Sequence, residues 1–102
     1  MVDQPDVFTA LAHPVRRKIL AMARDEAMAA GEIADAFDLA RPTLSGHFNV
    51  LKAAGLITVE RRGTKLLYAA NLSVLEDALS GLMDMLRLGE AANETLKEIK
   101  DA

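Results

Sequence analysis

Residues 31–71 read GEIADAFDLARPTLSGHFNVLKAAGLITVERRGTKLLYAAN, and this stretch decides the fold. Its first part, residues 31–37, carries apolar side chains at the spacing of a short helix. After a break at residues 38–40, Pro42 opens a second helix that we expect to end before Gly55. Two helices joined by so short a break are a candidate helix-turn-helix.

The apolar pattern then changes to the period of a strand. Residues 56–61 and 65–70 are predicted as two short strands, and residues 62–64 supply the turn between them, where Gly63 is free to take a positive φ. A hairpin with a basic tip directly after the second helix has the layout of the wing in a winged helix. The two elements in succession are far more specific than either one alone.

The rest of the chain is predicted to be helical. Helices are expected at residues 3–12, 15–24 and about 73–88, the last one capped by Asn71 or by Ser73 in a capping box with Glu76. The predicted fold is mainly α with one β-hairpin (α+β), in the order helix, helix, helix, helix, hairpin, helix. Residues 1–89 are expected to form one domain, and residues 90–102 a polar tail, as a frayed helix or disordered.

Composition excludes several classes of protein. The 102 residues suffice for one domain. The chain has no Cys, which removes disulfides, thiol catalysis and thiolate metal sites. One Tyr, three Phe and no Trp disfavour a single-strand binder built on aromatic platforms. No apolar run reaches the roughly 18 residues of a membrane span, and the N-terminus has no pattern of a signal peptide, so a cytoplasmic protein without membrane insertion is expected.

The formal net charge of −3 argues by itself against a nucleic-acid partner. The charge is unevenly distributed, however. Residues 41–65 carry five basic residues and one acidic residue, a net +4, whereas residues 1–40 carry −3 and residues 66–102 carry −4. The small net charge therefore conceals a basic region between acidic flanks, and this region coincides with the second helix and the hairpin.

Residues 31–71, together with LAHPVRRKIL at residues 11–20, resemble the ArsR-type winged helix-turn-helix transcriptional repressors. The pattern Pro42-x-x-Ser45-x-His47, followed by LKAAGLI at residues 51–57, is similar to the SdpR-like branch of autorepressors in particular. The resemblance implies a homodimer, joined through its first and last helices, that represses its own or neighbouring promoters.

The residues themselves also point to double-stranded DNA. The buried side of the second helix of the helix-turn-helix is defined by Leu44, Phe48 and Leu51. Short polar side chains therefore face outward, as in a helix that enters the major groove. The basic hairpin tip can lie along the minor groove and neutralise phosphates. The predicted DNA-binding residues are Arg41, Thr43, Ser45, Gly46, His47, Asn49, Lys52, Arg61, Arg62, Thr64 and Lys65.

Several of these assignments have a structural alternative. His47 matches the helix histidine that contacts DNA in the family, or it is only a partly covered packing residue. The hairpin tip is either a wing or merely a solvated turn. The basic run at residues 16–18 either touches the DNA backbone or forms an exposed helix face paired with acidic neighbours.

Two positions depart from the family pattern. Gly46 stands where relatives usually have a larger polar residue, and Phe48 replaces the usual Leu, which is a tolerable change if the neighbours repack. Either the backbone approaches DNA closely at Gly46, or specificity comes from Arg41, Asn49 and DNA shape. We favour the second interpretation.

A dimer would place two such helices in successive major grooves, about 34 Å apart on a pseudo-palindromic operator. The apolar faces of the first and last helices are the predicted dimer interface. It comprises Val7, Phe8, Leu11, Leu72, Leu75, Leu79, Leu82, Met83 and Leu86.

The sequence gives no sign of a metal-sensing site or a cofactor. The chain has two His, and His13 is expected to cap or pack at a helix start. Regulation is then by a sequestering protein, as the resemblance implies, by autoregulation alone, or by a small apolar effector in a pocket at the dimer interface. Such a pocket would use residues from the set Met22, Met28, Met83 and Met85, which otherwise fill the core and the interface.

Two other classes of function remain as rivals. A winged-helix module that binds a protein rather than DNA would have an acidic or apolar wing, and the basic hairpin tip argues against this alternative. An enzyme would need a nucleophile with its base, a phosphate-binding loop or a metal set, and no such motif is present, so the chain is predicted not to be an enzyme.

Overall fold

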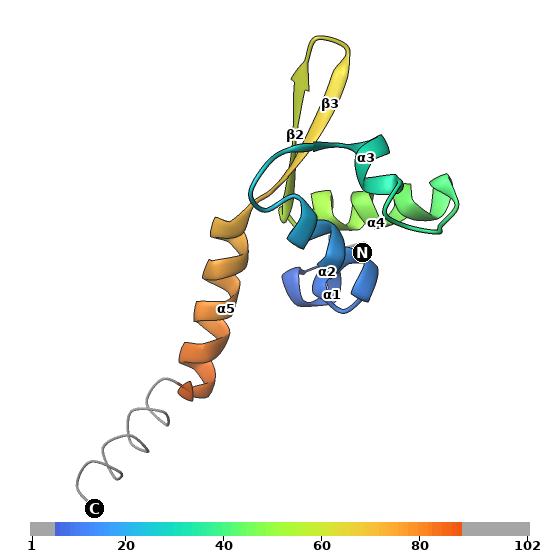
Figure 1. Ribbon diagram of the computed structural model, residues 1–102. Coiled ribbons are helices and arrows are strands. Elements are labelled where there is room, and N and C mark those ends of the chain that lie inside the picture. Colours follow the sequence, from blue (N-terminus) through green and yellow to red (C-terminus); the bar gives the residue numbers. More distant parts are fainter. Residues whose placement is uncertain (1–5, 89–102) are drawn as a thin grey trace, which may run out of the picture.

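A computed structural model describes residues 6–88 and has the winged helix-turn-helix α+β fold (Figure 1). A cluster of short helices forms the body, a β-hairpin extends from one end, and the last helix leads away from the other. The elements in chain order are α1 (Val7–Leu11), α2 (Pro14–Met22), β1 (Met28–Ala29), α3 (Ala30–Ala34), α4 (Arg41–Ala53), β2 (Ile57–Arg62), β3 (Lys65–Ala70) and α5 (Leu72–Leu86).

The first two helices begin at side-chain caps. The Asp6 carboxylate accepts a hydrogen bond from the Thr9 backbone N–H at 2.7 Å, and this bond lowers the pKa of Asp6. Pro14 occupies the first turn of α2, and Nδ1 of His13 accepts from the Val15 N–H at 3.1 Å. The predicted role of His13 at a helix start is thus confirmed.

Between α3 and α4 the chain forms the predicted helix-turn-helix. The first of these helices ends at Ala34, earlier than predicted, and hydrogen-bonded turns continue as far as Phe37. Gly55 follows α4 with a φ of +77°, as expected for a residue that ends a helix in the left-handed conformation.

The prediction of a single hairpin was incomplete, because the sheet has three strands in the order β1-β3-β2. The extra strand β1 pairs antiparallel with β3, with Met28 opposite Tyr68. Two residues are too few to show a strand period, so the sequence did not reveal it. The hairpin turn is also tighter than predicted: Arg62 pairs with Lys65, and Gly63 adopts a φ of +63°.

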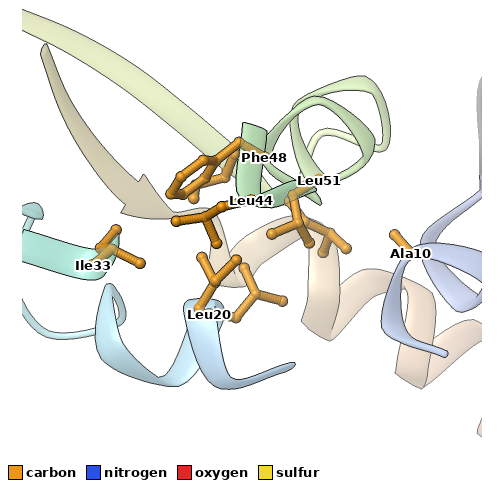
Figure 2. Packing of buried hydrophobic residues seen from close by; sticks show 9 residues of the cluster. Ala10, Leu20, Ile33, Leu44, Phe48 and Leu51 are labelled. Atoms are coloured by element: carbon orange, nitrogen blue, oxygen red, sulfur yellow. The ribbon is translucent and has the colours of Figure 1, made fainter. Parts of the chain in front are cut away.

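The core joins the helix-turn-helix to the base of the hairpin. Figure 2 shows Leu20, Ile33, Leu44, Phe48 and Leu51 converging from α2, α3 and α4. The buried apolar residues are Ala10, Ile19, Leu20, Ala23, Ile33, Leu44, Phe48, Leu51, Leu56 and Ile57. The Phe48 ring also stacks on Tyr68 of β3, with 4.8 Å between ring centroids, so the predicted inner face of α4 is confirmed and holds the hairpin in place.

The last helix differs from the rest because none of its residues is buried. It begins after Asn71, which occupies the N-cap position as one of the two predictions had it, although its side chain makes no capping hydrogen bond. The alternative, a capping box of Ser73 and Glu76, is wrong because Ser73 lies inside the helix. Residues 89–102 lie outside the described part of the chain, and with them the predicted polar tail and the domain boundary. None of the helices within residues 6–88 is long and apolar enough to cross a membrane.

Candidate nucleic-acid interface

The outer face of α4 is open and carries mostly small side chains. At 100° per residue, Gly46 and Asn49 lie opposite the buried Leu44, Phe48 and Leu51, and both are exposed. A Cβ atom added at Gly46 would meet nothing within 4 Å. The centre of this face therefore admits close approach of a partner and offers a single polar side chain, that of Asn49.

One flank of α4 carries a polar stripe. Arg41, Ser45 and Asn49 follow at intervals of four residues, and all three are exposed. They line a small hollow of about 110 Å³ together with Tyr68 of β3 and parts of α3. The stripe thus lies beside the base of the hairpin, where the helix and the wing can meet the same stretch of a ligand.

His47 lies on the other flank and is half-buried. Its Nδ1 is 3.2 Å from Nη1 of Arg16, and its ring centroid is 4.4 Å from that of His13. Burial lowers the pKa of His47, and the charges of His13 and Arg16 add to this effect. The structure thus shows the packing contacts of this residue, and its contact with DNA stays a prediction.

The basic run after α1 forms contacts that sequence reasoning missed. Arg16 donates to the carbonyl oxygen of Ala10 at 2.6 Å, and Arg17 donates to that of Leu11 at 2.7 Å. The Lys18 ammonium lies 5.1 Å from the centre of the Phe37 ring. Of the two alternatives for this run, pairing with acidic neighbours is not found within residues 6–88, where the arginines instead bond to carbonyls at the end of α1. Contact of the run with DNA stays a prediction. The sequence held a signal for these hydrogen bonds, because two arginines follow closely after the predicted end of the first helix.

The hairpin tip presents exposed cations. Arg61, Arg62 and Lys65 are all exposed around Gly63. Arg62 also pairs with Glu60, with distances of 3.3 and 3.4 Å between its nitrogens and the carboxylate oxygens. Both side chains project from one face of β2, because residues two apart on a strand share a face. This spacing is the signal from which the ion pair could have been predicted. Thr43, Lys52 and Thr64 complete the set of exposed predicted residues.

The predicted dimer residues form an apolar surface on α1 and α5. Phe8 is 43% exposed, Leu79 is 42% exposed and Leu86 is 55% exposed. A groove of about 520 Å³ between α2 and α5 is lined mainly by leucines, with Arg17, Arg24 and Glu76 at its margin. The other predicted interface residues are half-buried or exposed: Val7, Leu11, Leu72, Leu75, Leu82 and Met83.

No group of three or more His, Cys, Asp or Glu residues within the described range is placed to hold a metal ion. The four methionines considered for an apolar effector are not gathered together. Met22 and Met28 pack against the core, whereas Met83 and Met85 are exposed on α5. Neither hollow described above is lined by a methionine.

Fold, basic hairpin and open α4 together define a winged helix-turn-helix protein of the DNA-binding kind. A family model described as a helix-turn-helix domain matches residues 11–60. The transcriptional repressor SdpR of Bacillus subtilis is 36% identical over 85 residues, which are 83% of this chain and 94% of SdpR. The chain belongs to the ArsR family of helix-turn-helix transcriptional regulators.

Solved structures agree with this assignment. The crystal structure of an ArsR family transcriptional regulator superposes with a TM-score of 0.71 at 28% identity, covering 81% of this chain and 91% of that one. An ArsR-like transcriptional regulator from Rhodococcus sp. RHA1 gives a TM-score of 0.75 at 24% identity, covering 93% and 87%, and supports the fold alone. These relatives are transcriptional regulators and not enzymes, in agreement with the sequence prediction.

Proposed function

We propose that this protein is a homodimeric repressor of transcription that binds a pseudo-palindromic operator in double-stranded DNA. The observation that carries the proposal is that the basic segment of the sequence folds into α4 and the hairpin, the elements that a winged helix presents to DNA. Of the three segments 1–40, 41–65 and 66–102, only residues 41–65 carry a net positive charge, and they comprise α4 and the hairpin. Membership of the ArsR family supports the same reading.

In this proposal α4 enters the major groove, and Arg41, Ser45 and Asn49 are its base-reading candidates. Arginine can bind guanine O6 and N7 with two hydrogen bonds, and asparagine can do the same with adenine N6 and N7. Arg61, Arg62 and Lys65 of the wing neutralise backbone phosphates. The acidic segments on either side lower affinity for DNA of arbitrary sequence.

The dimer is proposed to form through α1 and α5. A 15-residue helix with several half-exposed leucines and no buried residue is stable in water only if another surface covers it. A second copy of the same helix and of the groove between α2 and α5 would supply that surface symmetrically.

Autoregulation is proposed from the similarity to SdpR. The protein would act in the cytoplasm. Its proposed effector is a sequestering protein or a small apolar molecule. The test is a gel-shift titration with DNA from upstream of the protein's own gene, against a shuffled duplex of equal length. We expect binding at least about 1000-fold tighter to the upstream DNA. Equal affinity for both duplexes would contradict specific recognition, and no affinity for either would favour a protein-binding winged helix.

A further inference from the structure

Arg16 of α2 makes hydrogen bonds to two other helices at once. Its Nε donates to the Ala10 carbonyl at 2.6 Å and its Nη2 to the Thr9 carbonyl at 3.2 Å, both in α1. Its Nη1 lies 3.2 Å from Nδ1 of His47 in α4. All three nitrogens of one half-buried guanidinium are thus in use, and they join the first helix to the recognition helix.

This arrangement determines which nitrogen of His47 carries the proton. A guanidinium group only donates hydrogen bonds, so Nδ1 of His47 must accept, and the neutral ring carries its proton on Nε2. The ring of His13 packs against that of His47 at 4.4 Å, and its own Nδ1 accepts from the Val15 backbone. His47 is therefore held by a hydrogen bond at one edge and by a ring at its face.

We infer that Arg16 is a positioning residue for DNA recognition, which orients α4 and fixes His47 as an Nε2–H donor toward the DNA. This inference rests on the proposed function and assigns to it a residue outside the predicted DNA-binding set. A donor at Nε2 pairs with phosphate oxygens, guanine O6 and N7, or thymine O4, and not with the amino groups of adenine or cytosine. Because Arg16 also holds α1, the orientation of α4 is tied to the proposed dimer interface.

The surroundings of the ring keep it neutral. The titratable and charged groups that face His47 within residues 6–88 are His13 and Arg16, and both are basic. A second proton on the ring would sit at Nδ1, where it would point a donor at the donor of Arg16. The neutral donor form is consequently the form present near neutral pH.

The binding test compares Arg16→Met with Lys18→Met. Lys18 carries the same charge on the same helix, is exposed and lies outside the groove between α2 and α5, and its ammonium contacts the Phe37 ring, so its variant is the matched control. For each protein we measure affinity for operator and shuffled DNA over a range of salt concentrations. Arg16→Met is expected to lower the ratio of the two affinities about tenfold and Lys18→Met to leave it unchanged, with equal salt slopes.

Two results would overturn the positioning role. A salt slope shallower by about 0.9 in Arg16→Met than in Lys18→Met would show that Arg16 binds a phosphate directly. Full operator affinity in Arg16→Lys would show that charge alone suffices, because a single ammonium nitrogen cannot replace three guanidinium nitrogens at their separate acceptors.

A third measurement needs no variant that alters the folded contacts. The chain has two histidines, so the ¹⁵N shifts of their ring nitrogens are readily assigned by NMR on the intact protein. We expect neutral His47 with its proton on Nε2, and a proton on Nδ1 would overturn the inference. Wild-type protein that binds all duplexes alike would refute the proposed function, whereas this NMR readout would still report on the Arg16 contact alone.

Discussion

The charge of the wing is partly neutralised within one strand. Glu60 and Arg62 pair at 3.3 Å, and both side chains are well exposed. An exposed pair of this kind contributes little to stability, about 1 kcal/mol or less, but it places a carboxylate where DNA phosphates are expected. Arg62 therefore has a competitor for phosphate that Arg61 and Lys65 lack in the described structure.

Two substitutions in the wing should have opposite effects. Arg62→Ala is expected to weaken binding to all DNA sequences alike and to lower the salt slope by about 0.9, because one phosphate contact is lost. Glu60→Gln is expected to strengthen binding to all sequences, because it removes the anion and frees Arg62. Fluorescence anisotropy over a salt series measures both. Unchanged affinity and slope in Arg62→Ala would remove the wing from the proposed interface.

The lowered pKa of His47 makes a prediction about stability and pH. Because the pKa is lower in the folded protein than the ordinary value of 6.5, the unfolded chain binds more protons in this range, and stability rises with pH. The contribution of His47 is complete above about pH 6.5 and is lost as the pH falls through the folded value. Thermal unfolding between about pH 5 and pH 8 measures this, and His47→Gln should flatten the dependence. An equal slope in the variant would assign the effect elsewhere.

At the scale of elements, the glycine inside α4 and the glycine that follows α4 should respond in opposite ways to substitution by alanine. Gly55 has a φ of +77°, where a Cβ is strained, whereas Gly46 lies inside α4 with open space around it. We expect Gly55→Ala to lower the free energy of unfolding by about 1–2 kcal/mol. We expect Gly46→Ala to raise it by about 1 kcal/mol, because alanine favours the helix. Denaturant unfolding compares the two.

The same Gly46→Ala variant decides how α4 meets DNA. If recognition relies on Arg41, Asn49 and DNA shape, the added methyl group leaves operator affinity within about twofold of wild type. A loss of tenfold or more, in a protein that is as stable as expected, would instead show that DNA approaches the backbone at Gly46. Binding to a shuffled duplex is the control, since it reports on phosphate contacts alone.

Elements with a strong local signal were predicted, and those set by distant partners were not. The spacing of Leu44, Phe48 and Leu51 specified the buried face of α4, and Gly55 and Gly63 marked turns that only a residue tolerant of positive φ adopts easily. The strand β1 escaped prediction because its two residues become a strand only by pairing with β3. The first helix begins at Val7 and not at Asp3 for a local reason, because the Asp6 carboxylate caps its first turn.

The candidate site divides in a similar way. The sequence predicted which residues of α4 and the hairpin are exposed and basic, since periodicity and charge are local properties. It did not predict that Arg16 reaches both α1 and His47, because such a bond depends on the packing of three helices and on one rotamer. His47 was assigned to DNA by resemblance, with a packing role as the alternative, and its particular partners His13 and Arg16 required the tertiary structure.

At the scale of the whole molecule, the proposed dimer supplies a partner for α5, which has no buried residue within one chain. We expect Leu79→Glu to give monomers that no longer bind the operator, because the change places two buried charges in each symmetric interface. Loss of two buried leucines at about 1.5–3 kcal/mol each raises the dimer dissociation constant about 100-fold or more. Ser80→Glu adds the same charge at an exposed neighbour on α5 and is the matched control. Sedimentation measures the mass of both variants, and an intact Leu79→Glu dimer would show that the subunits meet through another surface.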